Sequence, residues 1–322
     1  MLENIRENLL GIVSAFCFES GRIKECILCE KNVIKTKYGD LIPKYGADEV
    51  RKKYCHSISF YESGKVKSIS LESSTLIKTP LGTYPTELVT FYESGNLKRI
   101  FPLNGKLSGY WSQEDEEQLC EEFQFYFPFG SFKTKIIGLC FYEGGNLRSM
   151  TLWPGEIVIL KNDDRLLPVR IGFSLYENGK LKSVEPAYPI VVPTLIGELT
   201  AYNENAVGIN ADCNSLAFTE RGNIQALCTS GSKVAIFEKD GSFETMKAIV
   251  KPDPFEEGVF SLVPLEISFE GHYVKFNSDK KRIYDINTTR FTVINDSIPD
   301  SESKLSCIDC SSCSLCKKSN YI

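Results

Sequence analysis

The chain has 322 residues, 42% of them hydrophobic, and a formal net charge of −5. This length and apolar content suffice for a large buried core, and the negative charge argues against a general affinity for nucleic acid or an acidic membrane. No stretch approaches the roughly 18 apolar residues that a membrane-spanning helix needs.

The N-terminal region carries a short apolar stretch from Leu9 to Phe18. Glu3, Arg6 and Glu7 precede it, and it continues without a cleavage site into the segment that follows. This pattern predicts a helical cap or a first strand and not a signal peptide, so we expect a cytoplasmic protein.

A ten-residue segment, Phe91 to Ile100, recurs along the chain. Near-identical copies occupy 60–69, 141–150 and 175–184, and weaker copies occupy 17–26, 218–227 and 237–246. Seven copies predict an all-β repeat architecture before any chemistry is considered.

Each copy predicts one β-hairpin. Two apolar pieces flank Glu-Ser-Gly or a variant of it, the composition of a type I turn followed by a left-handed glycine bulge. In that register Phe91 faces Leu97 across the hairpin, and the equivalent pairs form a buried ladder. The predicted turn glycines are Gly21, Gly64, Gly95, Gly145, Gly179, Gly222 and Gly241.

Charged residues recur around the same turns. A glutamate two residues before the glycine is accompanied by a base three residues after it, as in Glu93 and Lys98. The signs are exchanged in the last copy, at Lys239 and Glu244. This exchange predicts a structural ion pair across each turn and not a catalytic carboxylate.

Further turns lie between the copies. Gly82, Gly130 and Gly258 precede the glycines of later turns by 13 to 15 residues, often beside proline. They predict a second hairpin per unit, and the segment 267–286 resembles one or two eroded hairpins that close the stack.

The longest spacing between copies holds an acidic insertion at 113–118. This insertion could be a solvent-exposed surface loop, a partner-binding loop or a site for a hard cation.

The Phe-Tyr-Glu-Ser-Gly-Asn-Leu-Lys pattern resembles the MORN-type repeat, in its bacterial variant with a Tyr-x-x-Gly-x-Leu-Lys core. The resemblance covers most of 16–246. It implies an elongated sheet of stacked hairpins used as a scaffold, in a branch often labelled antitoxin-like. Some MORN proteins are proposed to contact phospholipid, but the uneven spacing of these copies does not favour a lipid role here.

The C-terminal tail carries the only dense group of cysteines in the sequence. Cys307, Cys310, Cys313 and Cys316 repeat at a strict spacing of three. The run resembles the three-ligand segment of bacterial ferredoxins, although its fourth cysteine comes one residue early and no proline follows. A [4Fe–4S] cluster, zinc and a metal-free thiol tail all remain open, with zinc less favoured by this spacing.

No catalytic constellation stands out. The two histidines, His56 and His272, are not placed to activate a nucleophile, and the common phosphate-binding and zinc-protease motifs are missing from the sequence. Of the other cysteines, Cys17, Cys140 and Cys228 lie in strand-like contexts that favour core positions. Cys26 and Cys29 could form half of a metal site, although Cys26 occupies an apolar repeat position.

The sequence therefore predicts an all-β, elongated repeat sheet of stacked antiparallel β-hairpins over 1–294, a polar linker at 295–306 and a Cys-rich tail at 307–322. The expected role is a non-enzymatic scaffold for a protein partner. Its candidate contact residues are the repeat tyrosines Tyr61, Tyr92, Tyr142 and Tyr176, which could instead pack against neighbouring hairpins. The alternatives are a redox accessory protein that uses the tail, and an antitoxin-like partner of a toxin.

Overall fold

Strands account for 59% of the chain and helix for 2% in this computed structural model, which confirms the predicted all-β class. The structure describes residues 8–46, 51, 55–105, 109–208, 211–252, 258, 260–277 and 281–295. The predicted Cys-rich tail and nearly all of the predicted linker lie outside these ranges.

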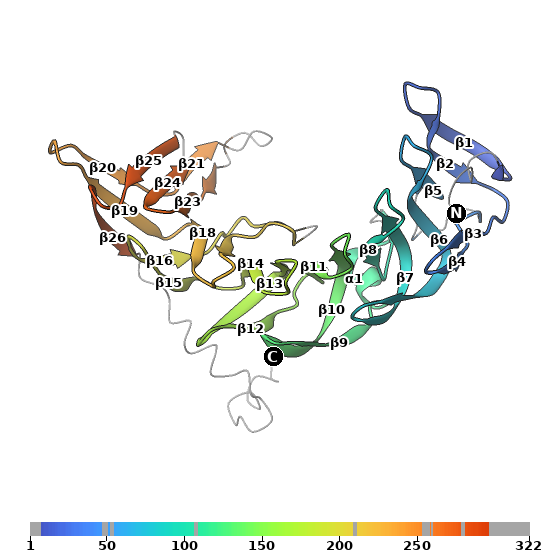
Figure 1. The fold of residues 1–322 in the computed structure, drawn as a ribbon, viewed down its shortest axis with the longest axis horizontal. Helices are drawn as coiled ribbons and strands as arrows, with labels where there is room; N and C mark the ends of the chain where they lie inside the picture. The colour runs from blue at the N-terminus through green and yellow to red at the C-terminus, as the bar shows by residue number, and fades with distance from the viewer. Residues whose placement is uncertain are drawn as a thin grey trace. The chain divides into compact units, whose positions relative to one another are not determined.

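Twenty-six strands and one short helix follow one another in the described ranges (Figure 1). The helix is α1 (Gln113–Glu117). The strands are β1 (Ile12–Cys17), β2 (Ile23–Leu28), β3 (Ile34–Thr36), β4 (Gly39–Leu41), β5 (Ile58–Phe60), β6 (Val66–Thr79), β7 (Gly82–Phe91), β8 (Leu97–Phe101), β9 (Glu122–Phe127), β10 (Gly130–Phe141), β11 (Leu147–Leu152), β12 (Val158–Asn162), β13 (Arg165–Leu175), β14 (Leu181–Pro186), β15 (Ile190–Thr194), β16 (Gly197–Ala201), β17 (Leu216–Phe218), β18 (Ile224–Thr229), β19 (Ser232–Phe237), β20 (Phe243–Met246), β21 (Ile249–Pro252), β22 (Phe260–Val263), β23 (Leu265–Glu270), β24 (Tyr273–Asn277), β25 (Lys281–Asp285) and β26 (Arg290–Asn295).

The chain divides into two compact units. The first comprises Met1–Glu185 and Val207–Asn214, and the second comprises Pro186–Ala206 and Ser215–Ile322. Within the described ranges, no helix has the length and apolar character needed to cross a bilayer.

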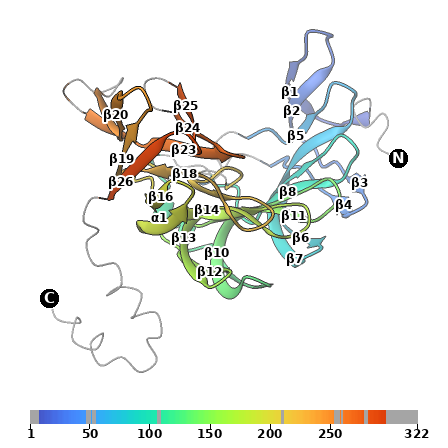
Figure 2. The same cartoon turned by 60° about the vertical axis from the view of Figure 1, so that its left-hand side comes forward.

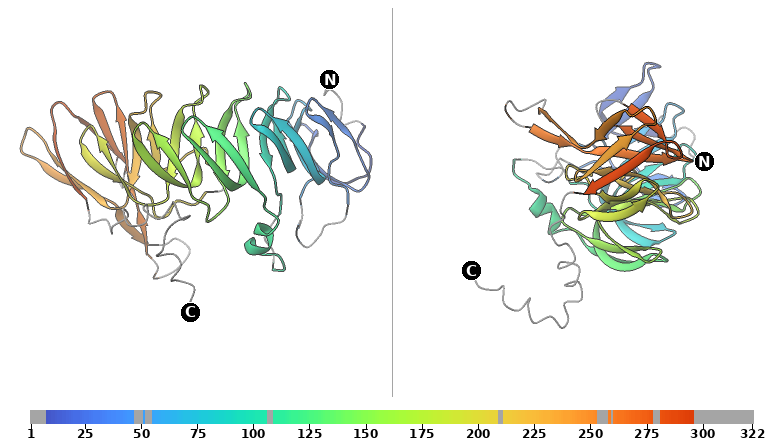
Figure 3. Two further views of the ribbon diagram at one scale, coloured as in Figure 1. Left: turned by 90° about the horizontal axis from the view of Figure 1, so that it is seen from below. Right: turned by 90° about the vertical axis from the view of Figure 1, so that its left-hand side faces the viewer.

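The first unit is built on a sheet of neighbouring hairpins (Figure 3). Antiparallel pairing gives the strand order β1-β2-β5-β6-β7-β8-β10-β11-β13. The predicted N-terminal element is thus a strand, β1, and each later copy of the repeat lies beside the previous one. This arrangement confirms the predicted stacking of hairpins.

The repeat hairpins have the predicted register. Phe91 faces Leu97 after a bulge, and the same pairing joins Phe60 to Val66 and Phe141 to Leu147. All six side chains are buried. Burying one such aromatic or aliphatic side chain stabilises a fold by about 1.5–3 kcal/mol, so this ladder is a principal source of stability in the sheet.

The turns also have the predicted geometry. Gly95 has φ of 83°, its N–H donates to the Tyr92 carbonyl at 2.9 Å, and the Tyr92 N–H donates to the Asn96 carbonyl at 2.8 Å. A residue with a Cβ is strained at this φ, which explains the glycine. The other six predicted turn glycines also have positive φ, at 76° to 99°.

Second hairpins extend the long strands on the side away from the repeat turns. The outer halves of β6 and β7 pair through a turn that ends at Gly82, and β9 pairs with the first half of β10 at Gly130. The predicted second hairpin is therefore present in these units. The connection from β8 to β9, which carries α1, leaves the sheet on the same side (Figure 3).

A later segment of the chain, 207–214, returns to the first unit. Asp212 accepts a hydrogen bond from the Ser149 hydroxyl at 2.6 Å and forms an ion pair with Arg99. The Ala211 N–H donates to the Thr151 hydroxyl at 3.1 Å. Polar side chains on β8 and β11 thus hold this segment in place.

The second unit contains two of the three weaker repeat copies, 218–227 and 237–246, and the end of the described chain (Figure 2). Phe218 faces Ile224 and Phe237 faces Phe243, the register of the first unit. Strands β23, β24 and β25 form an antiparallel meander beside β18, which confirms the eroded hairpins predicted for 267–286. A separate three-stranded sheet has the order β20-β19-β26.

Candidate functional site

The repeat tyrosines link each hairpin to the next. Their hydroxyls donate to the backbone carbonyl of the residue before the tyrosine of the following hairpin, from Tyr61 to Phe91 at 2.7 Å, from Tyr92 to Phe141 at 2.8 Å and from Tyr142 to Leu175 at 2.8 Å. The rings are half-buried, and burial raises the pKa of all three hydroxyls above the ordinary tyrosine value. Tyr61, Tyr92 and Tyr142 therefore pack against neighbouring hairpins, which was the alternative to partner binding. A partner-binding role stays a prediction for all four tyrosines.

The bases of the repeat lie over these tyrosine rings. The distances from the cation to the ring centroid are 5.9 Å for Lys67 and Tyr61, 5.3 Å for Lys98 and Tyr92, 5.9 Å for Arg148 and Tyr142, and 5.6 Å for Lys182 and Tyr176. Such contacts are cation–π interactions.

The predicted ion pair across each of these four turns is therefore wrong. The glutamates Glu62, Glu93, Glu143 and Glu177 are exposed and form no ion pair within the described residues. The glutamate lies at the tip of the turn, whereas the base lies on the returning strand beside the tyrosine. In the last copy, Glu244 lies 3.7 Å from Arg282.

A second row of hydrogen bonds crosses the turn edge. The Asn96 side chain donates to the Glu143 carbonyl at 2.9 Å, and the Asn146 side chain donates to the Glu177 carbonyl at 2.9 Å. In the first copy Arg22 occupies the equivalent position and donates to the Glu62 carbonyl at 3.0 Å. Tyrosine and asparagine thus fix the spacing between neighbouring turns.

The predicted metal ligands fall into two groups. Cys307, Cys310, Cys313 and Cys316 lie outside the described residues. Within the described ranges, no three His, Cys, Asp or Glu side chains gather as they would around a metal ion. Cys26 is buried and Cys29 exposed, which agrees with a core role for Cys26.

The remaining cysteines and histidines are dispersed. Cys140 is buried as predicted, but Cys17 is exposed because β1, which carries it, is exposed along its whole length. His56 lies 3.3 Å from Glu25, and His272 is in the turn between β23 and β24.

The acidic insertion forms the short helix α1, and its N-terminus is capped by the sequence itself. The Ser112 hydroxyl accepts from the Asp115 N–H at 3.2 Å, and the Asp115 carboxylate accepts from the Ser112 N–H at 2.9 Å. This is a capping box, and its hydrogen bonds from Ser112 lower the pKa of Asp115. The helix turns the Glu116 side chain inward, so Glu116 is only 6% exposed.

Glu116 belongs to a buried charge cluster with Arg51 and Glu87. Arg51 donates from Nε and Nη2 to Glu116, at 2.9 and 2.8 Å, and from Nη1 and Nη2 to Glu87, both at 3.1 Å. The Trp111 indole N–H and the Gly105 N–H also donate to Glu116, at 2.7 and 3.1 Å. The Asn104 N–H donates to Glu87 at 2.9 Å.

The electrostatics of this cluster favour a permanently charged guanidinium. Burial alone would lower the pKa of Arg51, but the hydrogen bonds and charges of Glu116 and Glu87 outweigh burial and raise it above the ordinary value. The cluster fastens Arg51 and α1 to strand β7.

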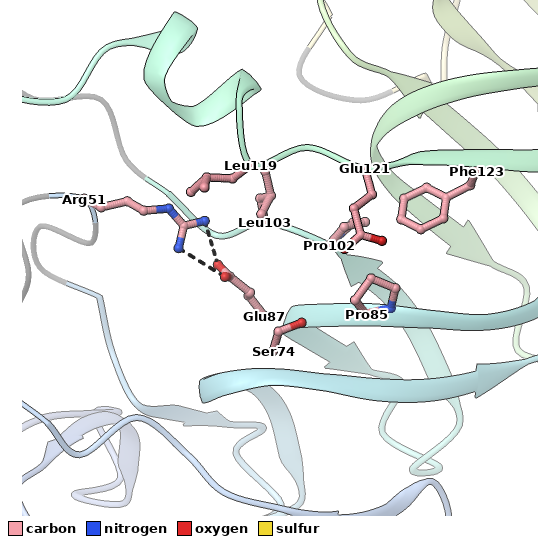
Figure 4. Close-up of a pocket in the computed structure, with 9 residues that line it drawn as sticks. All are labelled: Arg51, Ser74, Pro85, Glu87, Pro102, Leu103, Leu119, Glu121 and Phe123. Atoms are coloured by element: carbon pink, nitrogen blue, oxygen red, sulfur yellow. Dashed lines mark hydrogen bonds and ion pairs between the residues drawn. The ribbon is translucent and has the colours of Figure 1, made fainter.

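A pocket of about 200 Å³ opens beside this cluster (Figure 4). Five of its nine lining residues are apolar, and three of the other four are charged. The lining residues are Arg51, Ser74, Pro85, Glu87, Pro102, Leu103, Leu119, Glu121 and Phe123. An apolar wall with a few charged groups can hold an amphipathic group of limited size.

Sequence reasoning missed this pocket and its charge cluster. The acidic insertion was open to interpretation as a solvated excursion, yet Glu116 is buried and bonded on both carboxylate oxygens. The Ser112-x-x-Asp115 capping signal could have identified the helix. Arg51 and Glu116 are 65 residues apart, and no local pattern connects them.

Comparison with protein-family models, with curated proteins and with solved structures found no match.

Proposed function

We propose that this protein is a non-enzymatic, MORN-like repeat scaffold that binds a protein partner. The observation that carries the proposal is the pocket beside Arg51 and Glu87. Pockets for cofactors and drug-sized ligands occupy about 300–1,000 Å³. A pocket of about 200 Å³ with an apolar wall suits one side chain of another protein, the arrangement found at interface hot spots.

The hairpin rows support the scaffold part of the proposal. Each tyrosine and asparagine bond joins one copy of the repeat to the backbone of the next, so neighbouring hairpins are held at a fixed spacing. A surface built this way needs little ordering when a partner binds, and that lowers the free-energy cost of association. The four repeat tyrosines remain a second proposed contact row, through their half-exposed rings.

Site-specific photocrosslinking would test the proposal. Leu119 at the pocket rim is 46% exposed, and Leu166 on β13 of the same unit is 60% exposed. A photoreactive phenylalanine analogue at each position, in the full chain within its native cells, should crosslink a discrete protein from position 119 and not from position 166. Equal crosslinking from both positions, or none from 119, would overturn the pocket as a partner site.

A second candidate, an iron–sulfur or zinc protein, rests on the spacing of Cys307, Cys310, Cys313 and Cys316. Its test is the iron, zinc and acid-labile sulfide content of the full chain purified without oxygen. Iron and sulfide in near-equal amounts, lost in a Cys310→Ala, Cys313→Ala variant, would support a cluster. Zinc without sulfide would support a zinc site, and no metal would exclude both.

A further inference from the structure

We infer that the pocket beside Arg51 receives a basic side chain of the partner, with arginine favoured over lysine. The inference rests on the proposed scaffold function and names the chemistry of what its pocket binds. It depends on three features of the described residues: how the charges around the pocket are balanced, what the wall is made of, and where the exposed carboxylate of Glu121 lies.

The charges around the pocket are unbalanced in favour of a cation. Among the described residues that line it, Arg51 is the one cation, and Glu87 and Glu121 line it with Glu116 directly behind. In this part of the described chain, one positive and three negative groups leave an excess of two negative charges. Two described lysines of β10 do not restore the balance, because Lys133 pairs with Glu122 at 2.7 Å and Lys135 with Glu117 at 3.1 Å.

Arg51 is not placed to attract an anion. Its Nε, Nη1 and Nη2 atoms all donate to the two buried carboxylates. A partner carboxylate or phosphate would have to compete with these bonds and would face Glu87 and Glu121 at close range. The cluster therefore positions Arg51 as part of the wall and selects against acidic ligands.

Glu121 supplies the group that would meet a cation. It is exposed, and its carboxylate makes no hydrogen bond or ion pair with the residues that the structure describes. Figure 4 shows the Glu121 side chain pointing into the pocket between Pro102 and Phe123. A charge-assisted hydrogen bond to this carboxylate would need no existing contact to be broken.

The wall suits the stem and head of an arginine. Pro85, Pro102, Leu103 and Leu119 offer apolar surface for the methylene stem, which long basic side chains commonly bury. The Phe123 ring beside Glu121 offers a face on which a guanidinium could stack. The planar guanidinium can stack and bond a carboxylate together, which favours arginine over lysine.

The test titrates the full chain, labelled with carbon-13 at leucine methyl groups, with N-acetyl-arginine amide. N-acetyl-citrulline amide is the matched uncharged probe, and N-acetyl-leucine amide the apolar one. We expect the Leu103 and Leu119 methyl signals to shift in a saturable way with the arginine probe. The citrulline probe should bind about tenfold more weakly, because it lacks the charge that Glu121 recognises.

Two variants locate the effect. Glu121→Gln keeps the side-chain shape and removes the charge, so arginine binding should fall by about tenfold to the level of citrulline. Glu62→Gln removes another exposed carboxylate, at a repeat turn, and should leave arginine binding unchanged.

Three results would overturn the inference: equal binding of arginine and citrulline, stronger binding of the leucine probe, or no saturable shift with the arginine probe. If position 119 still crosslinks a protein in any of these cases, the scaffold proposal survives and only the nature of the inserted side chain is wrong. If position 119 also fails to crosslink, both proposals fall.

Discussion

The hydroxyl of Tyr92 donates a hydrogen bond to the backbone carbonyl of Phe141, 2.8 Å away and 49 residues further along the chain. This bond joins the β7–β8 hairpin to the β10–β11 hairpin, and Tyr61 and Tyr142 make its equivalents. The tyrosine of each of these repeats therefore has two roles: it forms part of its own turn, and its hydroxyl connects that turn to the next hairpin.

Tyr92→Phe should destabilise the first unit by about 1 kcal/mol, because it removes the hydroxyl that donates to the Phe141 carbonyl. Urea unfolding followed by circular dichroism would measure the loss. Tyr126 on β9 is 77% exposed and its hydroxyl makes no hydrogen bond within the described residues, so Tyr126→Phe is the matched control. A loss no larger than that of the control would mean that the hydroxyl row does not stabilise the sheet.

Gly179→Ala tests the turn conformation without steric interference. Gly179 has φ of 83°, and a Cβ built there would meet no atom within 4 Å. The variant should lose about 1–2 kcal/mol, the cost of a left-handed conformation for a residue with a Cβ. Gly109 is equally open but does not have positive φ, so Gly109→Ala should leave thermal stability unchanged or slightly higher. Equal effects of the two substitutions would contradict the bulged turn.

The sequence alone predicted the repeat hairpins because their determinants are local. Phe91, Gly95 and Leu97 lie within seven residues, and glycine at positive φ together with a buried cross-strand pair fixes both turn and register. The base of each copy was assigned to the wrong partner. Lys98 lies over the Tyr92 ring and not beside Glu93, since the bulge sets the side chain on the returning strand next to the tyrosine.

The candidate site could not be predicted in the same way. Arg51, Glu87 and Glu116 come from three separate segments, and only the pairing of hairpins brings them within hydrogen-bond distance. Composition indicated an acidic insertion at 113–118 but not which carboxylate turns inward. The inward orientation of Glu116 depends on Trp111 and Gly105, whose N–H groups have no sequence signature as carboxylate donors.

Arg51→Met should be among the most destabilising single substitutions in the first unit. It leaves the side chains of Glu87 and Glu116, 9% and 7% exposed, close together without their shared cation. Removing one partner of a buried charge cluster costs about 3–5 kcal/mol, and the larger part of that is the penalty of the charges left behind. Urea unfolding of the full chain would measure it.

Lys133→Met provides the comparison for Arg51→Met. Lys133 and Glu122 form an ion pair with side chains 60% and 46% exposed. Such an exposed pair contributes about 0–1 kcal/mol, so this variant should stay close to the unmodified chain. Similar losses for the two variants would show that the Arg51 cluster is no more than a surface ion pair.

The buried cysteines make a prediction about thiol reactivity and pH. Burial raises the pKa of Cys26 and of Cys120 to about 11. At about pH 8 only about one thousandth of either thiol would be ionised, and the thiolate is the reactive form. Iodoacetamide should therefore modify exposed Cys213 well before Cys26 or Cys120 in the folded chain. Peptide mass spectrometry over time would give the three rates.

The same shifts set a direction for stability at alkaline pH. The pKa of each thiol is raised above its ordinary value of 9.0, so the folded state prefers the neutral thiol. The stability that each buried neutral thiol contributes is fully present below about pH 9 and is lost as the pH rises through about 11. Cys120→Ala should weaken this alkaline loss, whereas Cys213→Ala at an exposed position should not. If Cys120 in the folded chain were alkylated as fast as Cys213, the β9–β10 region would have to open readily. The pocket wall at Leu119 and Glu121 would then be too mobile to hold a partner side chain in one position.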